Sequence, residues 1–137
     1  MLVRVVLLAS VALFVAPAAL ACSCLCTTTS ASVNWGADAT YVFRGEVLSV
    51  ESHGDPLEDG FENIRMKVTK LMKGEPKAII TLRGPAGGVS ACGVGFRKGG
   101  IENVIAFREE DGYLWTSQCA QYCATGAGVF KSLENGQ

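Results

Sequence analysis

The sequence is short of the residues on which enzymes and nucleic-acid-binding proteins depend. It contains one histidine, His53, and no nucleophile motif, so we expect no enzymatic activity. His53 stands in an acidic stretch, where a solvated loop residue is a better interpretation than a catalytic base. The formal net charge is −1 and no basic stripe is present, which argues against a nucleic-acid partner. The sequence also has no N-x-S/T sequon, internal repeat or low-complexity tract.

The longest apolar run lies at the start of the chain. Arg4 precedes it, and the sequence ALA before Cys22 is an A-x-A cleavage site. These features predict a signal peptide over residues 1–21 and a secreted, extracellular domain over residues 22–137. The run is shorter than the roughly 20 residues of a membrane-spanning helix, so we expect no membrane span. A lipoprotein signal is the alternative, because a cysteine follows the cut.

Alternating and β-branched stretches predict five strands in a single domain. Gly45 indicates a bulge in the first strand, and Asp111-Gly112 indicates a hairpin turn. Helix is expected in residues 30–38 and after Cys119, and a long loop over residues 84–100. The predicted fold is all-β dominated, a five-stranded OB-type barrel with short flanking helices. The strands are expected at residues 41–50, 63–71, 78–83, 103–108 and 113–117.

Half of the six cysteines stand in one short stretch, ACSCLC, at residues 21–26. Side chains alternate along an extended chain, so Cys22, Cys24 and Cys26 would point one way while Ser23 and Leu25 point the other. An even number of cysteines in an exported chain predicts three disulfides. Cys92, Cys119 and Cys123 are the remaining three, and spacing alone leaves fifteen pairings open.

The cysteine cluster also has two simpler interpretations. It could serve only to stabilise a modest core. It could bind zinc or copper through thiolates, although C-x-C-x-C differs from the usual spacing of zinc sites.

Other conspicuous residues have alternative roles too. Trp35 and Trp115 suit core packing better than partner contacts. Arg65, Lys67 and Lys70 would form the solvated side of a strand, with polysaccharide binding as the alternative.

Several stretches resemble the N-terminal, netrin-like domain of the tissue inhibitors of metalloproteinases (TIMPs). That family begins its mature chain with C-x-C, as Cys22-Ser23-Cys24 does here. Residues 64–74 (IRMKVTKLMKG) resemble its basic strand ending in K-G, and residues 89–93 (VSACG) its S-V-C-G loop. Residues 111–119 (DGYLWTSQC) resemble its hairpin. The resemblance extends over nearly all of residues 22–137 and implies a netrin-like OB-type barrel.

The resemblance also implies a pairing and a mechanism. The amine and carbonyl oxygen of Cys22 would chelate the catalytic zinc of a target protease in trans, and the chain would hold no cofactor of its own. Ser23 would point toward the main specificity pocket of the protease. Leu25 would add apolar contact, and the loop Val89-Ser90-Ala91 would lie beside this segment. With Cys24 these residues make up the expected inhibitory edge. The implied disulfides are Cys22–Cys92, Cys24–Cys119 and Cys26–Cys123.

We therefore expect a secreted, monomeric inhibitor of zinc metalloproteinases of the matrix type, without the cysteine-rich second domain of the family. The rival hypothesis is a netrin-like structural or adaptor module without an inhibitory edge. It is favoured by Leu25-Cys26, which stand where the family has a proline-containing segment. A third hypothesis is oligosaccharide binding, which would require exposed aromatic residues on the barrel face.

Overall fold

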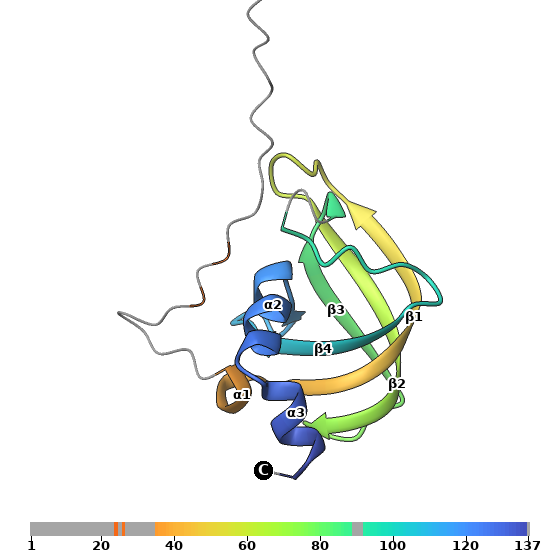
Figure 1. Cartoon of the computed structure of the whole chain (residues 1–137). Helices are drawn as coiled ribbons and strands as arrows, with labels where there is room; N and C mark the ends of the chain where they lie inside the picture. The colour runs from red at the N-terminus through yellow and green to blue at the C-terminus, as the bar shows by residue number, and fades with distance from the viewer. Residues whose placement is uncertain (1–23, 25, 27–34, 89–91, 137) are drawn as a thin grey trace, which may run out of the picture.

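The protein folds as one β-sheet with three short helices against it (Figure 1). The computed structural model describes residues 24, 26, 35–88 and 92–136. The strands are β1 (Tyr41–His53), β2 (Phe61–Lys73), β3 (Ile79–Pro85), β4 (Ile101–Arg108) and β5 (Leu114–Trp115). The helices are α1 (Trp35–Asp38), α2 (Gln118–Gly126) and α3 (Val129–Glu134). The predicted β-dominated fold with five strands and short helices is confirmed.

The strand order closes the sheet on itself as β1-β2-β3-β5-β4. β1 pairs with β2 on one side and with β4 on the other, and β2 pairs with β3, all antiparallel. The short β5 lies between β3 and β4. It pairs antiparallel with β4 and meets β3 in parallel at Arg83 and Trp115. Every strand therefore has two neighbours, although β5 covers only a short part of β4.

Several element boundaries differ from the sequence predictions. β1 continues to His53 and β2 begins at Phe61, and these two residues pair at the end of the ladder. His53 is therefore the last residue of a strand rather than part of a loop, because ladder pairing extends the strands into a polar stretch. β5 has two residues where residues 113–117 were expected. Of the expected helix over 30–38, residues 30–34 lie outside the described part of the chain.

Two glycine predictions are confirmed. The register of β1 on β2 shifts between Arg44 and Gly45, which is the predicted bulge. A Cβ at Gly45 would lie 2.9 Å from the carbonyl oxygen of Lys67, so the two strands approach too closely there for a larger residue. At the β4–β5 hairpin Gly112 has a φ of 86°, and the amide of Tyr113 donates to the Asp111 carboxylate at 3.0 Å.

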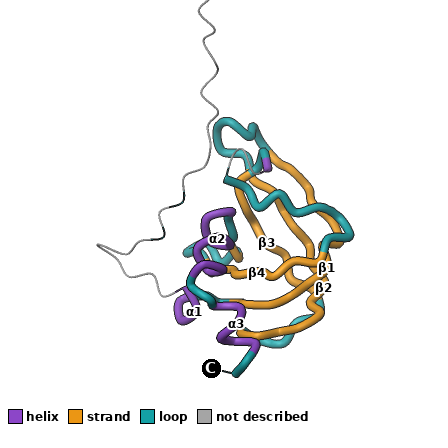
Figure 2. Tube along the Cα trace, in the orientation of Figure 1, coloured by secondary structure: helices purple, strands orange, loops and turns teal. Residues whose placement is uncertain are grey.

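The strands bury a different apolar set on each face. The inner core fills the sheet interior and is made of Tyr41, Phe43, Val47, Ile64, Met66, Ile80, Leu82, Val104, Ala106 and Leu114. The outer core lies between the sheet and the helices and is made of Ala39, Val42, Ile105, Ala120, Ala124 and Val129. All three helices lie on the same side of the sheet (Figure 2). Alternation along β1 and β4 therefore supplies both cores at once.

The tryptophans are at least half-buried. Trp35 packs against the outer core, with its ring 5.9 Å from that of Phe107 in an edge-to-face arrangement. Trp115 is half-buried on β5. Within the part of the chain that the structure describes, no helix is long and apolar enough to cross a membrane.

Candidate functional site

The candidate site is at the start of α2, where two disulfides attach the cysteine cluster to the fold. Cys24 bonds to Cys119, and Cys26 bonds to Cys123, with Cα–Cα distances of 5.1 and 5.3 Å. These are the partners that the TIMP resemblance implies. Because all four sulfurs are bonded in pairs, they are not thiolates available to zinc or copper.

The distance between Cys24 and Cys26 along an extended chain matches the distance between Cys119 and Cys123 along the helix. Cys119 and Cys123 are four residues apart on a helix, so they lie on one face and about 6 Å apart along the axis. Two residues of extended chain rise by roughly 6.6 Å, which is nearly the same step. A C-x-C segment can therefore run alongside a helix that carries C-x₃-C and form two bridges in register.

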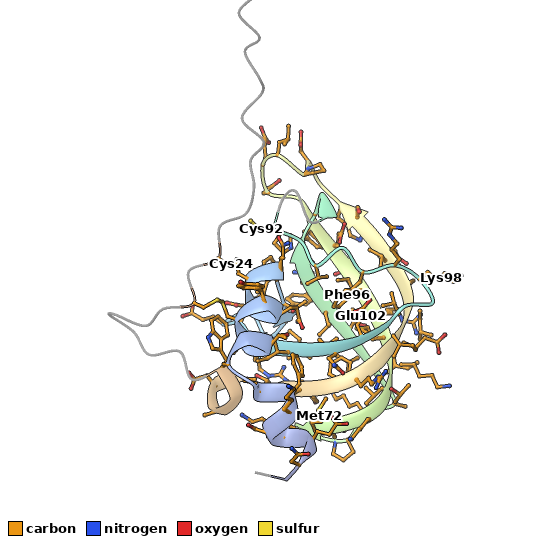
Figure 3. All side chains as sticks on the ribbon, in the orientation of Figure 1. Cys24, Met72, Cys92, Phe96, Lys98 and Glu102 are labelled. Atoms are coloured by element: carbon orange, nitrogen blue, oxygen red, sulfur yellow. A yellow bond between two sulfur atoms is a disulfide. The ribbon has the colours of Figure 1, made fainter. Side chains whose placement is uncertain are left out.

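The start of α2 also holds the loop that contains Cys92. The backbone amide of Gln118 donates to the carbonyl oxygen of Cys92 at 3.0 Å, which satisfies one of the amides that a helix leaves unpaired at its start. Ser117 caps the same turn by accepting from the amide of Ala120 at 3.2 Å. Figure 3 shows Cys24 and Cys92 close to the same end of α2.

Cys92 has an unusual backbone conformation. Its φ is 63°, and it is the one non-glycine residue with positive φ in the described part of the chain. Such a conformation costs roughly 1 to 2 kcal/mol. Cys92 is disulfide-bonded, and its expected partner Cys22 lies outside the described residues. The bond and the Gln118 contact together hold the residue in this conformation.

The base of this loop is closed by two glycines. The amide of Gly93 donates to the carbonyl oxygen of Gly88 at 2.9 Å. A Cβ at Gly93 would lie 2.5 Å from the carbonyl oxygen of Pro85, so only glycine fits. Of the expected inhibitory edge, Cys22, Ser23, Leu25, Val89, Ser90 and Ala91 lie outside the described residues. The structure thus describes the anchors of both segments, Cys24 and Cys92.

A buried polar network fixes α2 against β4. The side-chain amide of Gln121 donates to the carbonyl oxygen of Ile105 at 2.9 Å and accepts from its N–H at 3.3 Å. It also donates to the hydroxyl of Thr116 at 2.5 Å, and this hydroxyl donates to Ile105 at 2.8 Å. Sequence reasoning missed Gln121, because nothing in a single sequence distinguishes it from a solvated glutamine.

A second feature that sequence reasoning missed is a stack of side chains on the outer face of the sheet. The guanidinium of Arg83 lies 4.5 Å from the ring centroid of Phe61 and 3.3 Å from that of Tyr113. His53 also stacks on Phe61, with ring centroids 5.0 Å apart. Cation–π contacts of this kind stabilise by about 0.5 to 2 kcal/mol. His53 thus takes part in packing between strands.

The basic residues of β2 differ in their contacts. Arg65 and Lys67 are exposed, whereas Lys70 forms an ion pair with Glu134 at 2.8 Å. Lys73 donates to the carbonyl oxygens of Gly36 and Ala37 at the end of α1.

Comparison with known proteins and a search for metal ligands add no further assignment. No protein-family model and no curated protein matches the chain. Among the described residues, no group of three or more His, Cys, Asp or Glu side chains is placed to hold a metal ion.

Proposed function

We propose that the protein is a secreted inhibitor of zinc metalloproteinases of the matrix type, acting through the amino-terminal backbone of Cys22. One observation carries the proposal. Cys24 and Cys92, which adjoin the two expected inhibitory segments, are both attached to the first turn of α2. The attachment points of the two expected segments therefore lie at the same end of one helix, which supports a two-segment inhibitory surface.

The matched spacing supports the remaining bridge of the resemblance. Cys24 bonds at the second residue of α2, and Cys26 bonds one turn further on. Two extended residues before Cys24 would span roughly 6.6 Å in the opposite direction, so Cys22 would lie beyond the first residue of the helix. Cys92 is held there by Gln118. A Cys22–Cys92 bond therefore continues the register of the two described bonds.

The chemistry follows from a free α-amino group at Cys22. Such a group titrates near pH 7.7 to 8.0, so a useful fraction is neutral at physiological pH and can donate a lone pair to zinc. A catalytic zinc keeps an open position that is normally filled by the water it activates. The amine and carbonyl oxygen of Cys22 would supply ligands to the zinc in place of that water.

The neighbouring residues supply specificity in this proposal. Ser23 points toward the specificity pocket beside the zinc, Leu25 adds apolar contact, and the loop over residues 89–91 lies alongside. Two disulfides and the Gln121 network fix α2, the helix to which the proposed edge is attached, and a preorganised edge loses less entropy on binding.

The fold and compartment assignments belong to the same proposal. We infer a netrin-like barrel of the OB type, because five strands in a closed order with β5 inserted between β3 and β4 fit that architecture. Secretion is supported by the predicted signal peptide and by disulfides, which persist in oxidising compartments.

The test is a titration of the oxidised protein, with a mass-verified start at Cys22, against a panel of matrix metalloproteinases and a fluorogenic peptide substrate. We expect stoichiometric inhibition. One alanine added before Cys22 should abolish it without unfolding the domain, and one alanine added after Gln137 is the matched control. Equal potency of both extended proteins would exclude zinc capture by the terminus.

The specificity residue has its own test. Ser23→Gly should change the order of potency across the same panel, and an unchanged order would remove Ser23 from the site. No inhibition by the unblocked protein would instead favour a netrin-like structural or adaptor module.

A further inference from the structure

A pocket of about 590 Å³ is lined by residues of β4, of α2 and of the loop before β4. We call it the β4–α2 groove. Its volume is in the range of ligand pockets. The groove extends to the loop after Cys92, and Figure 3 labels Phe96 and Glu102 of its lining. The residues used below are Phe96, Ile101, Asn103, Gln118 and Tyr122, all of which line it.

One wall of the groove is the edge of β4. In an antiparallel strand, alternate residues direct both backbone polar groups to the same side. The amide of Thr40 donates to Ala106, and that of Val47 donates to Gly100, so the even-numbered residues face β1. Ile105 faces the other way, because its N–H and carbonyl oxygen both meet the side chain of Gln121. Ile101 and Asn103 therefore direct their backbone groups into the groove.

No strand within residues 35–88 and 92–136 pairs with this part of the edge. β5 reaches β4 only at Phe107 and Arg108. Gln121 covers Ile105 with one donor and one acceptor, as a peptide group of a neighbouring strand would. At Ile105 the side chain of Gln121 thus takes the place of a neighbouring strand. Asn103 and Ile101 lie further along the same edge. Unpaired edges of this kind are templates for another chain.

The opposite wall supplies complementary features. Gln118 lines the groove, and its side-chain oxygen Oε1 is buried without a hydrogen-bond partner among the described residues, so a rotation of this side chain would present an unused acceptor to the groove. Tyr122 is 66% exposed and Ile101 is 49% exposed, and Phe96, a partly buried residue of the loop before β4, also lines the groove. An acceptor and an apolar wall opposite a row of backbone groups match an extended peptide.

We propose that the β4–α2 groove binds an extended peptide segment of a partner protein by adding it as a strand to the edge of β4. Its backbone pairs with Ile101 and Asn103, one of its amides donates to Gln118, and an apolar side chain contacts Phe96 and Tyr122. The edge of β4 is recessed between a helix and a loop, so a single extended chain can reach it. An edge strand of a second copy would fit less well, because the strands beside it would have to enter the groove too. The proposal does not depend on protease inhibition.

The test starts with random linear nonapeptides, displayed on phage and selected against the oxidised protein carrying an extra alanine before Cys22. That form removes the amino-terminal site from the selection. We expect enriched peptides whose synthetic versions slow amide hydrogen exchange at Ile101 and Asn103. N-methylation of alternate peptide amides should abolish binding.

A matched pair of variants completes the test. Ile101→Lys should weaken binding by about tenfold or more, because it places a charge in the groove. Ile79→Lys changes a similarly exposed isoleucine at the start of β3 and should leave binding unchanged. The proposal is overturned if no peptide is enriched, if both variants bind alike, or if exchange slows elsewhere. Concentration-dependent dimerisation that protects the same amides would assign the groove to a second copy and overturn it as well.

Discussion

Helices α2 and α3 both cover the outer core, but they are held in different ways. α2 is attached through two disulfides and the Gln121 network. α3 packs through Val129, Phe130 and Leu133 and adds one ion pair, Lys70–Glu134, between exposed side chains. Exposed ion pairs contribute little to stability. The strong constraints are therefore concentrated on the helix that carries the candidate site.

The ends of the two helices show the same contrast. Ser117 caps α2 with its hydroxyl, whereas α3 starts at Gly128 without a side-chain cap. A helix as short as α3, with six residues, is not stable alone and depends on packing. Fraying of α3 would expose part of the outer core and leave α2 in place.

The largest effect is expected from removing a disulfide. The double variant Cys24→Ser, Cys119→Ser should lose about 2 to 5 kcal/mol of unfolding free energy, because the bond closes a loop with a sequence separation of 95. Leu133→Ala on α3 removes a half-buried side chain and should cost at most about 2 kcal/mol. Urea denaturation of the oxidised proteins measures both. Equal losses would contradict the distinction between the helices.

The polar network gives the next effect. Gln121→Leu removes the side-chain amide that bonds to the N–H and to the carbonyl oxygen of Ile105. The unfolding free energy should fall by about 1 to 3 kcal/mol. Gln118→Leu is the matched control on the same helix, because its buried Oε1 has no partner to lose. Thermal or urea unfolding compares the two. A loss for Gln118→Leu as large as that for Gln121→Leu would show that α2 is not fixed through the network.

Two glycines at the junction of the helices should respond with opposite signs. Gly128 has a φ of 73°, so Gly128→Ala should destabilise by roughly 1 kcal/mol. Gly126 ends α2, and a Cβ there would meet nothing within 4 Å. Gly126→Ala should therefore stabilise by up to about 1 kcal/mol. Melting temperatures that move in the same direction would refute this view of the junction.

The smallest effect concerns the ion pair on α3. The ammonium of Lys70 donates to the Glu134 carboxylate and lowers the pKa of that group. Because the pKa of Glu134 is lower in the folded protein than in the unfolded chain, its ionisation stabilises the fold at any pH above the unfolded pKa. This stabilisation is lost as the pH falls through the pKa of the folded protein. Lys70→Met should raise the pKa of Glu134 in an NMR titration.

The matched control for this titration is Lys131→Met on α3. Lys131 forms no ion pair with a described residue, so its replacement should leave the titration of Glu134 where it is. Neither variant should change unfolding as much as loss of a disulfide. An effect of Lys131→Met equal to that of Lys70→Met would mean that general charge, rather than the pair, sets the pKa.

Much of the fold was predictable because the signals are local. Alternation identified the half-buried strands, Asp111-Gly112 identified the hairpin, and Gly45 identified the bulge. The ends of β1 and β2 were not predictable, since pairing of His53 with Phe61 extends both strands into polar sequence. β5 is short because of its position between β3 and β4, and this position cannot be read from a single sequence.

The candidate site was less accessible from sequence. The cysteine pairs came from a family resemblance, because spacing alone left fifteen pairings open. The roles of Gln121 and Arg83 depend on partners from other segments, Ile105 and Thr116 for the first, Phe61 and Tyr113 for the second. Such contacts arise only after the sheet has closed.

The matched cysteine spacings have a consequence for oxidative folding. A chain shifted by one step along α2 would join Cys22 to Cys119 and Cys24 to Cys123 at the same pitch, leaving Cys26 for Cys92. Disulfide mapping after refolding from the reduced state would detect this isomer. The regular spacing of these thiols therefore permits a shifted pairing in which Cys24 lies one helical turn further along α2.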